Sequence, residues 1–161
     1  MEHMEKYWHW FCSGLSADPS LESRLIEKFG TPEEVYKIEE KKLLKAFPSN
    51  RKKLSLLCAG RKGWDFGREA DRLRRLEIRF VSRAHPLYPE RLRKVEDAPW
   101  GLFFRGGLPE DSLPAVAVVG ARNCSAYGRN VSFWFAEELA RHGVQIISGM
   151  ARGVDGISHR G

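Results

Sequence analysis

The sequence predicts an α/β chain with a helical N-terminal domain followed by the first part of a parallel sheet. Three observations support this fold class. Apolar residues recur at helical spacing through the first 76 residues, strand-like runs begin after Glu77, and two continuous apolar runs further on are separated by one helical pattern. We therefore expect two domains, residues 1–76 and 77–161.

The helical domain is predicted from apolar spacing and end signals. In "PSLESRLIEKFG", Leu21, Leu25 and Phe29 share one face of a helix that Gly30 ends. "TPEEVY" has a threonine three residues before a glutamate, which is a capping box, with a proline at the first helical position. "EEKKLLKAF" and "NRKKLSLLCAG" each place leucines on a single face, which completes a small bundle.

A further helix is predicted for "DFGREADRLRRLE". Its expected buried stripe is Phe66, Ala70, Leu73 and Leu76, and a second face carries Arg68, Arg72, Arg75 and Arg79. Like charges at this spacing destabilise a helix unless something anionic offsets them. Two explanations remain open: a phosphate backbone, or, as the favoured one, the nearby acids Asp65, Glu69 and Asp71.

The positive charge of the chain is concentrated in its middle third. Residues 41–94 carry 17 Lys and Arg against 5 Asp and Glu, a balance of +12, whereas residues 1–40 and 95–161 have balances of −5 and −1. This asymmetry indicates an anionic partner or, equally, a basic solvated surface.

The three cysteines form no C-x-x-C pair, which excludes a zinc site or disulfide framework of the usual kind and fits a reducing cytosol. No segment is long and apolar enough to span a membrane, and the acidic N-terminus, with a short aromatic patch broken by His9, is no secretory signal, so we expect no membrane association.

The second domain is predicted to contain a βαβ unit. "IRFVS" and the residues around 102–104 are strand-like, and "LPAVAVVGA" and "VQIISG" are apolar runs typical of parallel strands buried on both faces. Between them, "YGRNVSFWFAEELARHG" has the length and pattern of a crossover helix that ends at Gly143. We expect Val131, Phe133, Phe135 and their neighbours to face the sheet, and Trp134 to point away from it. This pattern indicates a Rossmann-like domain.

The turn Gly120-Ala121-Arg122 follows the first of these apolar strands. Ligands of doubly wound sheets bind beyond the carboxyl ends of the strands, and a glycine there lets a backbone approach closely. Arg122 presents a fork of donors that suits phosphate oxygens. A phosphate cradle is one interpretation, and a tight turn with a local ion pair is the other.

A second loop, "SGMARGVDGISHRG", follows the next strand and adds Ser148, Gly149, Arg152 and Gly153 to the candidate site. Asp155 is expected to cap a helix that begins at Gly156, so a structural role for Asp155 and His159 is favoured over acid–base catalysis. Neither a G-x-G-x-x-G nor a G-x-x-x-x-G-K-[ST] pattern occurs in these loops. No catalytic nucleophile, metal ligand set or cofactor is predicted.

These motifs resemble those of the DNA-processing protein A family (DprA, also called Smf). "HPLYPERLRKVEDAPWGLFFRGGLP", "VAVVGARNCSAYG" and "LARHGVQIISGMARGVDGISHRG" carry the resemblance, and the "LIEKFGTPEEVYK" region is similar to its sterile-alpha-motif (SAM)-like helical domain. The resemblance implies an extended Rossmann fold and a cytoplasmic protein that binds single-stranded DNA and hands it to the recombinase RecA in natural transformation. It also implies phosphate contact at Gly120, Ala121 and Arg122, a loop from Ser148 to Gly153 bordering the same pocket, and homodimerisation of full-length members of the family.

The sequence departs mildly from the family pattern at Met150, Val154, Gly156 and Ser158. Family members continue beyond the position of Gly161, so we expect a truncated chain with an unpaired strand edge, a bare apolar sheet face, and no dimer or RecA surface. A binding protein is favoured over an enzyme. The alternatives are a nucleotide-processing phosphoribohydrolase, whose Pro-Gly-Gly-x-Gly-Thr loop is absent here, and a protein-interaction module with an inert remainder.

Overall fold

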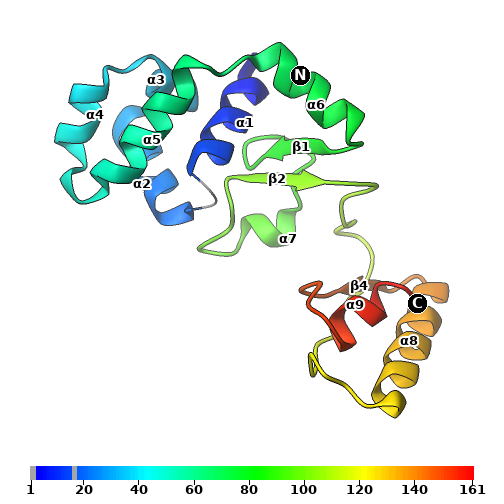
Figure 1. Ribbon diagram of the computed structural model, residues 1–161. Coiled ribbons are helices and arrows are strands. Elements are labelled where there is room, and N and C mark those ends of the chain that lie inside the picture. Colours follow the sequence, from blue (N-terminus) through cyan, green and yellow to red (C-terminus); the bar gives the residue numbers. More distant parts are fainter. Residues whose placement is uncertain (1–2, 16–17) are drawn as a thin grey trace. The chain divides into compact units, whose positions relative to one another are not determined.

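The computed structural model of the chain describes residues 3–15 and 18–161, which belong to two compact units. The first unit comprises residues 1–108 and the second residues 109–161 (Figure 1). The chain is α/β, with helices in the N-terminal part and two small two-stranded sheets after it.

The N-terminal part of the first unit is helical, as predicted. Its elements are α1 (His3–Leu15), α2 (Pro19–Phe29), α3 (Pro32–Lys37), α4 (Glu40–Ala46), the 3₁₀ turn η1 (Pro48–Asn50), α5 (Arg51–Lys62) and α6 (Phe66–Arg75). The predicted end signals are in place: Gly30, at φ +91°, ends α2, and Thr31 and Glu34 form the reciprocal hydrogen bonds of a capping box at α3.

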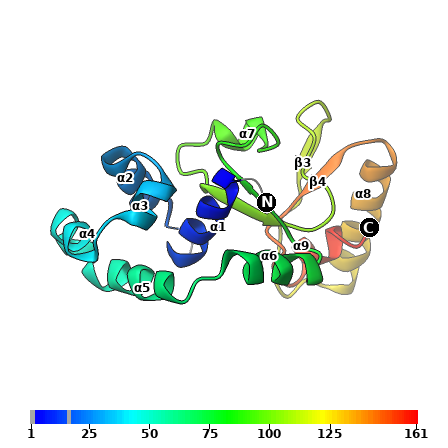
Figure 2. The same ribbon diagram turned by 90° about the horizontal axis from the view of Figure 1, so that it is seen from above.

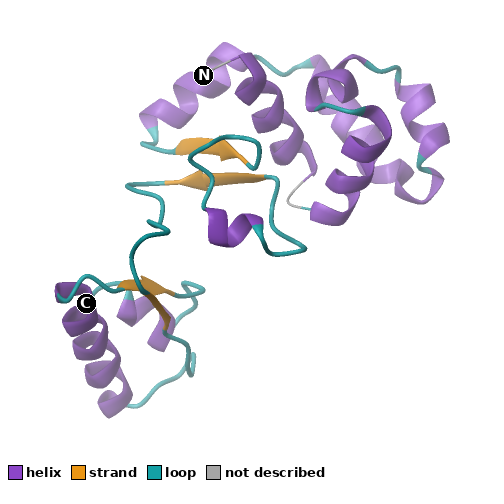
Figure 3. Cartoon of the chain, turned by 180° about the vertical axis from the view of Figure 1, so that it is seen from behind, coloured by secondary structure: helices purple, strands orange, loops and turns teal. Residues whose placement is uncertain are grey.

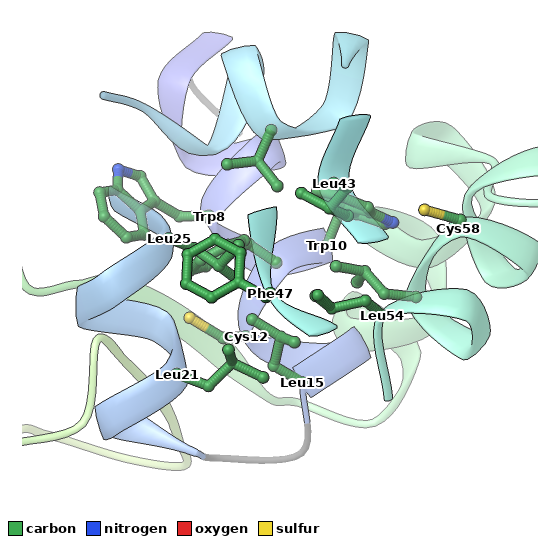
Figure 4. Close-up of a cluster of buried hydrophobic side chains, with 13 residues drawn as sticks. Trp8, Trp10, Cys12, Leu15, Leu21, Leu25, Leu43, Phe47, Leu54 and Cys58 are labelled. Atoms are coloured by element: carbon green, nitrogen blue, oxygen red, sulfur yellow. The ribbon is translucent and has the colours of Figure 1, made fainter. Parts of the chain in front are cut away.

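The core of this unit is built around α1 (Figure 4). Phe11 and Leu15 are fully buried there, and residues of α2, α4 and α5 such as Leu25, Leu43 and Leu54 pack against them. The spacing of residues 8, 11, 12 and 15 in "WHWFCSGL" is helical, so the sequence contained the signal for this central helix. No specific helix was predicted at this position.

The last helix of the bundle, α6, differs from its prediction. None of its residues is buried: Phe66 packs only partly against the core and Leu76 is 43% exposed, so the expected buried stripe is wrong. Arg79 does not belong to the arginine face, because α6 ends at Arg75 and Arg79 lies in the strand that follows. Its guanidinium group lies over the ring of Phe104. The favoured explanation for the remaining arginines holds in part, since Glu69 pairs with Arg72 and Asp71 pairs with Arg74.

An antiparallel hairpin completes the first unit. Strand β1 (Arg79–Ser82) pairs with β2 (Gly101–Phe104), and the short helix α7 (Glu90–Arg93) lies in the connection between them. Both strands were predicted, but as parts of the second domain. The structure places them in a sheet of their own, separate from the parallel strands (Figure 3).

The hairpin belongs to the first unit because it is joined to α1. The buried carboxylate of Glu5 accepts hydrogen bonds from the backbone N–H and the hydroxyl of Ser82, at 3.1 and 2.5 Å. The ring of Trp100 stacks on Trp8, with centroids 5.3 Å apart and planes 7° apart. The compact units therefore divide at residues 108 and 109, which differs from the predicted domain boundary at residues 76 and 77.

The second unit contains the predicted βαβ motif. Strand β3 (Ala115–Ala117) leads through α8 (Ala126–Arg141) to β4 (Gln145–Ile147), and the two strands pair in parallel with Ala115 opposite Gln145. Ser125 caps α8 by accepting a hydrogen bond from the N–H of Gly128, and Gly143, at φ +75°, follows its end. The short helix α9 (Val154–Ser158) ends the unit and packs against α8 (Figure 2).

The expectation that these strands are buried on both faces is wrong. Val116, Val119 and Ile147 are 40%, 75% and 44% exposed, because the sheet of the described residues has only two strands and too few helices to cover both faces. The bare apolar face that the family resemblance implied is thus present. On α8, Trp134 is 69% exposed as expected, whereas Phe135, expected to face the sheet, is 64% exposed.

Candidate nucleic-acid interface

The two candidate loops begin at the same edge of the parallel sheet. The N–H of Val118 donates to the carbonyl oxygen of Ile147 at 2.9 Å, so the strands remain paired up to the point where both loops start. Gly120, Ala121 and Arg122 follow β3, and the segment from Ser148 to Gly153 follows β4. This is the edge at which open α/β sheets bind their ligands.

Glycines bring the two loops into direct contact. A Cβ atom on Gly153, whose φ is +88°, would lie 2.6 Å from the carbonyl oxygen of Arg122 and closer still to that of Ala121. The next residue, Val154, donates its N–H to the carbonyl oxygen of Ala121 at 3.3 Å. Only glycine fits this approach of one backbone to the other.

Gly120 is the counterpart of Gly153 on the first loop. A Cβ atom at this position would lie 2.7 Å from the side chain of Val154. The beginning of α9 is therefore packed against the turn after β3. Sequence reasoning selected both glycines but missed Val154, whose only signal was its place directly after Gly153.

Two arginines project from the joined loops without partners. Arg122 and Arg152 are both exposed, and neither forms an ion pair or a side-chain hydrogen bond with any residue that the structure describes. A turn whose arginine pairs locally was the competing interpretation of Gly120-Ala121-Arg122, and that pair does not occur among the described residues. Both guanidinium groups are free to bind an anion with their planar forks of donors.

The remaining candidates, Ser148 and Gly149, lie beside α9. The carbonyl oxygen of Ser148 is 3.5 Å from Nε2 of His159. The buried hydroxyl of Ser148 has no hydrogen-bond partner in the described part of the chain. A Cβ atom on Gly149 would be 3.2 Å from a carboxylate oxygen of Asp155. These residues adjoin the loop junction, while Gly120, Ala121, Arg122 and Gly153 form it.

Asp155 does not cap a helix in the predicted way. Helix α9 begins at Val154, and its N-cap is Gly153, which has no side chain to accept a hydrogen bond. Asp155 instead lies in the first turn of α9, where it is 8% exposed. A carboxylate is favourable at this end of a helix because the free N–H groups there are electropositive.

The described residues contain no cluster of His, Cys, Asp and Glu side chains that could hold a metal ion. None of their helices combines the length and apolar character needed to cross a membrane. The chemical features of the loop junction are thus two free arginines and a tightly packed backbone. Such an arrangement can bind a phosphate group.

Comparison with known proteins identifies the family. The profile of DNA recombination-mediator protein A matches residues 79–161, which include both loops and slightly more than half of the chain. Protein Smf of Borreliella burgdorferi is 40% identical over 72 residues, and Protein Smf of Escherichia coli is 44% identical over 73 residues. Each of these alignments covers 45% of this chain.

The fold agrees with a solved structure. DNA processing protein A (DprA) from Streptococcus pneumoniae matches 99% of this chain with a TM-score of 0.65 and 23% sequence identity. The chain spans 54% of that protein, and its alignments span 23% and 20% of the two Smf proteins. On the family profile and the fold, this chain belongs to the family of DNA recombination-mediator protein A.

Proposed function

We propose that this chain binds single-stranded DNA at the junction of the loops after β3 and β4, as part of DNA processing in natural transformation. The observation that carries the proposal is the pair of unpartnered arginines, Arg122 and Arg152, on two loops held together by Gly153. Family membership supports DNA as the source of the phosphate.

The contacts of this site are directed at phosphates. Guanidinium groups bind phosphate oxygens in pairs, and no aromatic side chain stands in either loop segment, residues 120–122 or 148–153. Binding is therefore expected to be indifferent to base sequence and to weaken steeply as salt is raised. Binding that stays constant as salt rises severalfold contradicts the proposal.

Arg122 is expected to contribute most, since its backbone is fixed by the glycine packing between the loops. We predict that Arg122→Ala weakens the binding of a fluorescein-labelled oligothymidylate about tenfold or more, the effect of losing a charged hydrogen bond of about 1.5–3 kcal/mol. Arg141→Ala is the matched control in the same unit, because Arg141 is exposed but already paired with Glu137 at 2.6 Å. It should change the affinity less than about twofold. Equal effects of the two substitutions contradict a site at the loops.

The same titration separates DNA binding from nucleotide processing. If the loops serve a phosphoribohydrolase-like enzyme, AMP should compete with the oligonucleotide at comparable concentration. If they bind the polymer, the oligonucleotide should be strongly preferred. If neither binds, the chain acts through another surface and the proposal fails.

Delivery of the strand to RecA and assembly into a homodimer are the finer parts of the proposal, and they apply to full-length members of the family. Their support is family membership. Mixing the oligonucleotide-bound chain with RecA and following RecA assembly on the strand tests the first. Sedimentation equilibrium tests the second.

A further inference from the structure

A long stretch of the first unit carries positive charge without any negative charge. Between residues 41 and 64 the sequence has eight Lys and Arg and no Asp or Glu. These residues form α4 from its second residue on, η1 and α5, which pack against one another at one end of the unit (Figure 2). Such a concentration of like charge destabilises the compact state by self-repulsion, and a bound anionic partner offsets this repulsion.

Two of the eight cations have structural roles. Lys53 pairs with Asp18 at 2.8 Å and so ties α5 to the beginning of α2. Arg61 donates hydrogen bonds to the carbonyl oxygens of Tyr36 and Ile38, at 2.6 and 2.7 Å, which fixes the end of α3. These two are therefore engaged within the unit.

Three of the remaining cations surround one open hollow. Lys41, Lys45 and Arg51 line a hollow of about 630 Å³ between α4 and α5, together with Leu44 and Glu40. All three cations are exposed, and none forms an ion pair or side-chain hydrogen bond in the described part of the chain. Glu40 accepts a hydrogen bond from Ser55 at 3.2 Å. We name Lys41, Lys45 and Arg51 the α4–α5 basic surface.

The arginines of α6, in the same unit, are neutralised in part. Arg72 pairs with Glu69 and Arg74 with Asp71, at 3.2 and 2.7 Å. Asp65, Glu69 and Asp71 thus accompany the four arginines of α6, whereas a single carboxylate adjoins the α4–α5 basic surface. The two surfaces have similar numbers of cations and different net charge.

We propose that the α4–α5 basic surface is a second contact for single-stranded nucleic acid, binding its phosphate backbone outside the parallel-sheet unit. This inference rests on the proposed function for the identity of the polymer. A phosphate backbone fits better than an acidic protein, because protein interfaces depend on buried aromatic or apolar anchors and the hollow offers only the half-buried Leu44. The absence of aromatic residues from its lining predicts contacts to phosphates alone.

The test compares two triple variants that remove the same charge. Lys41→Ala/Lys45→Ala/Arg51→Ala and the control Arg68→Ala/Arg72→Ala/Arg75→Ala each lower the net charge of the full chain from +6 to +3. Binding of a long labelled oligothymidylate is measured over a series of salt concentrations. We expect the first variant to bind about tenfold more weakly at low salt and to lower the salt slope of log K by about 2. The control should change the affinity less than about threefold.

The outcomes separate this inference from the proposed function. If both triple variants weaken binding equally, only net charge matters and the surface is no site. If the first variant binds as the wild type does while Arg122→Ala weakens binding, the proposed function stands and this inference is wrong. If the wild-type chain does not bind the oligonucleotide, both are wrong. If the variant loses binding of an acidic protein and keeps that of DNA, the partner is a protein and this inference is overturned. Thermal melting monitored by circular dichroism checks that all variants are folded.

Discussion

The two units of this chain differ in how much of their apolar surface is buried. In the first unit, aromatic and aliphatic residues from α1, α2, α4 and α5 close over a continuous core, with Phe11, Leu15 and Leu25 fully buried. In the second, Ala136 is the single hydrophobic residue that is buried among the described residues. Large apolar side chains such as Val119 and Phe135 are exposed instead.

The difference concentrates buried apolar surface in the first unit and leaves the candidate site on the second. A closed core supplies most of the free energy of folding, so the first unit can carry exposed, unneutralised charge on α4 and α5. The second unit has little buried apolar surface, and its loops are positioned mainly by close backbone packing around Gly120 and Gly153. Its candidate site therefore depends on glycine geometry more than on a core.

The largest effect is expected when a phenylalanine side chain is truncated in each unit. Phe11 is 0% exposed in the core and Phe135 is 64% exposed on α8. Phe11→Ala should lower the free energy of unfolding by about 3–5 kcal/mol, because it leaves a cavity. Phe135→Ala should lower it by less than about 1 kcal/mol. Urea unfolding followed by circular dichroism measures both, and similar losses would show that the second unit is packed as well as the first.

The next test concerns the glycine packing in the second unit. Gly153→Ala should destabilise this unit by about 2–4 kcal/mol, from the unfavourable positive φ and the collision with the backbone of the first loop. Gly143→Ala is the control, since Gly143 also has a positive φ, +75°, but open space around the new methyl group. Its cost should be only about 1–2 kcal/mol.

Hydrogen exchange of the amides in residues 109–161 measures the stability of the second unit in the two glycine variants. Oligonucleotide binding should fall with Gly153→Ala and stay within about twofold with Gly143→Ala. If the two variants behave alike, the contact between the loops does not hold the candidate site.

The smallest effect comes from a carboxyl group inside the first unit. Glu22 is 1% exposed, and burial, together with the nearby carboxylate of Asp18, raises its pKa to about 7. Because the folded state holds this proton more tightly than the unfolded state, the stabilisation is complete below pH ~4.5 and is lost as pH rises through about 7. Ionised Glu22 therefore weakens the unit at alkaline pH.

Glu22→Gln should remove this pH dependence and stabilise the first unit by about 1–3 kcal/mol at pH 8, as one pKa unit corresponds to about 1.4 kcal/mol. Glu27→Gln is the control on the same helix, because Glu27 is exposed. Urea unfolding at pH 5 and pH 8 tests the prediction. A loss of stability in Glu22→Gln at pH 8 would show that the carboxylate is solvated or paired after all.

The sequence by itself determined the local structure of this protein. Helix α2 between its proline and Gly30, the capping box at Thr31 and Glu34, and the β3–α8–β4 crossover all follow from signals within a few residues of one another. Both candidate loops were found in the same way, since a glycine directly after an apolar strand marks the edge where ligands bind.

Only the tertiary structure decided which elements belong together. The hairpin β1–β2 joins α1 because Ser82 and Trp100 meet Glu5 and Trp8, residues that are far apart in the sequence and carry no local signal for each other. The exposed faces of β3 and α8 were likewise decided by how many strands and helices surround them, because an apolar pattern shows which side can be buried but not what covers it. The contact of Gly153 with Ala121 is of the same kind: the sequence identified both loops, and the packing of one backbone on the other joins them into a single candidate site.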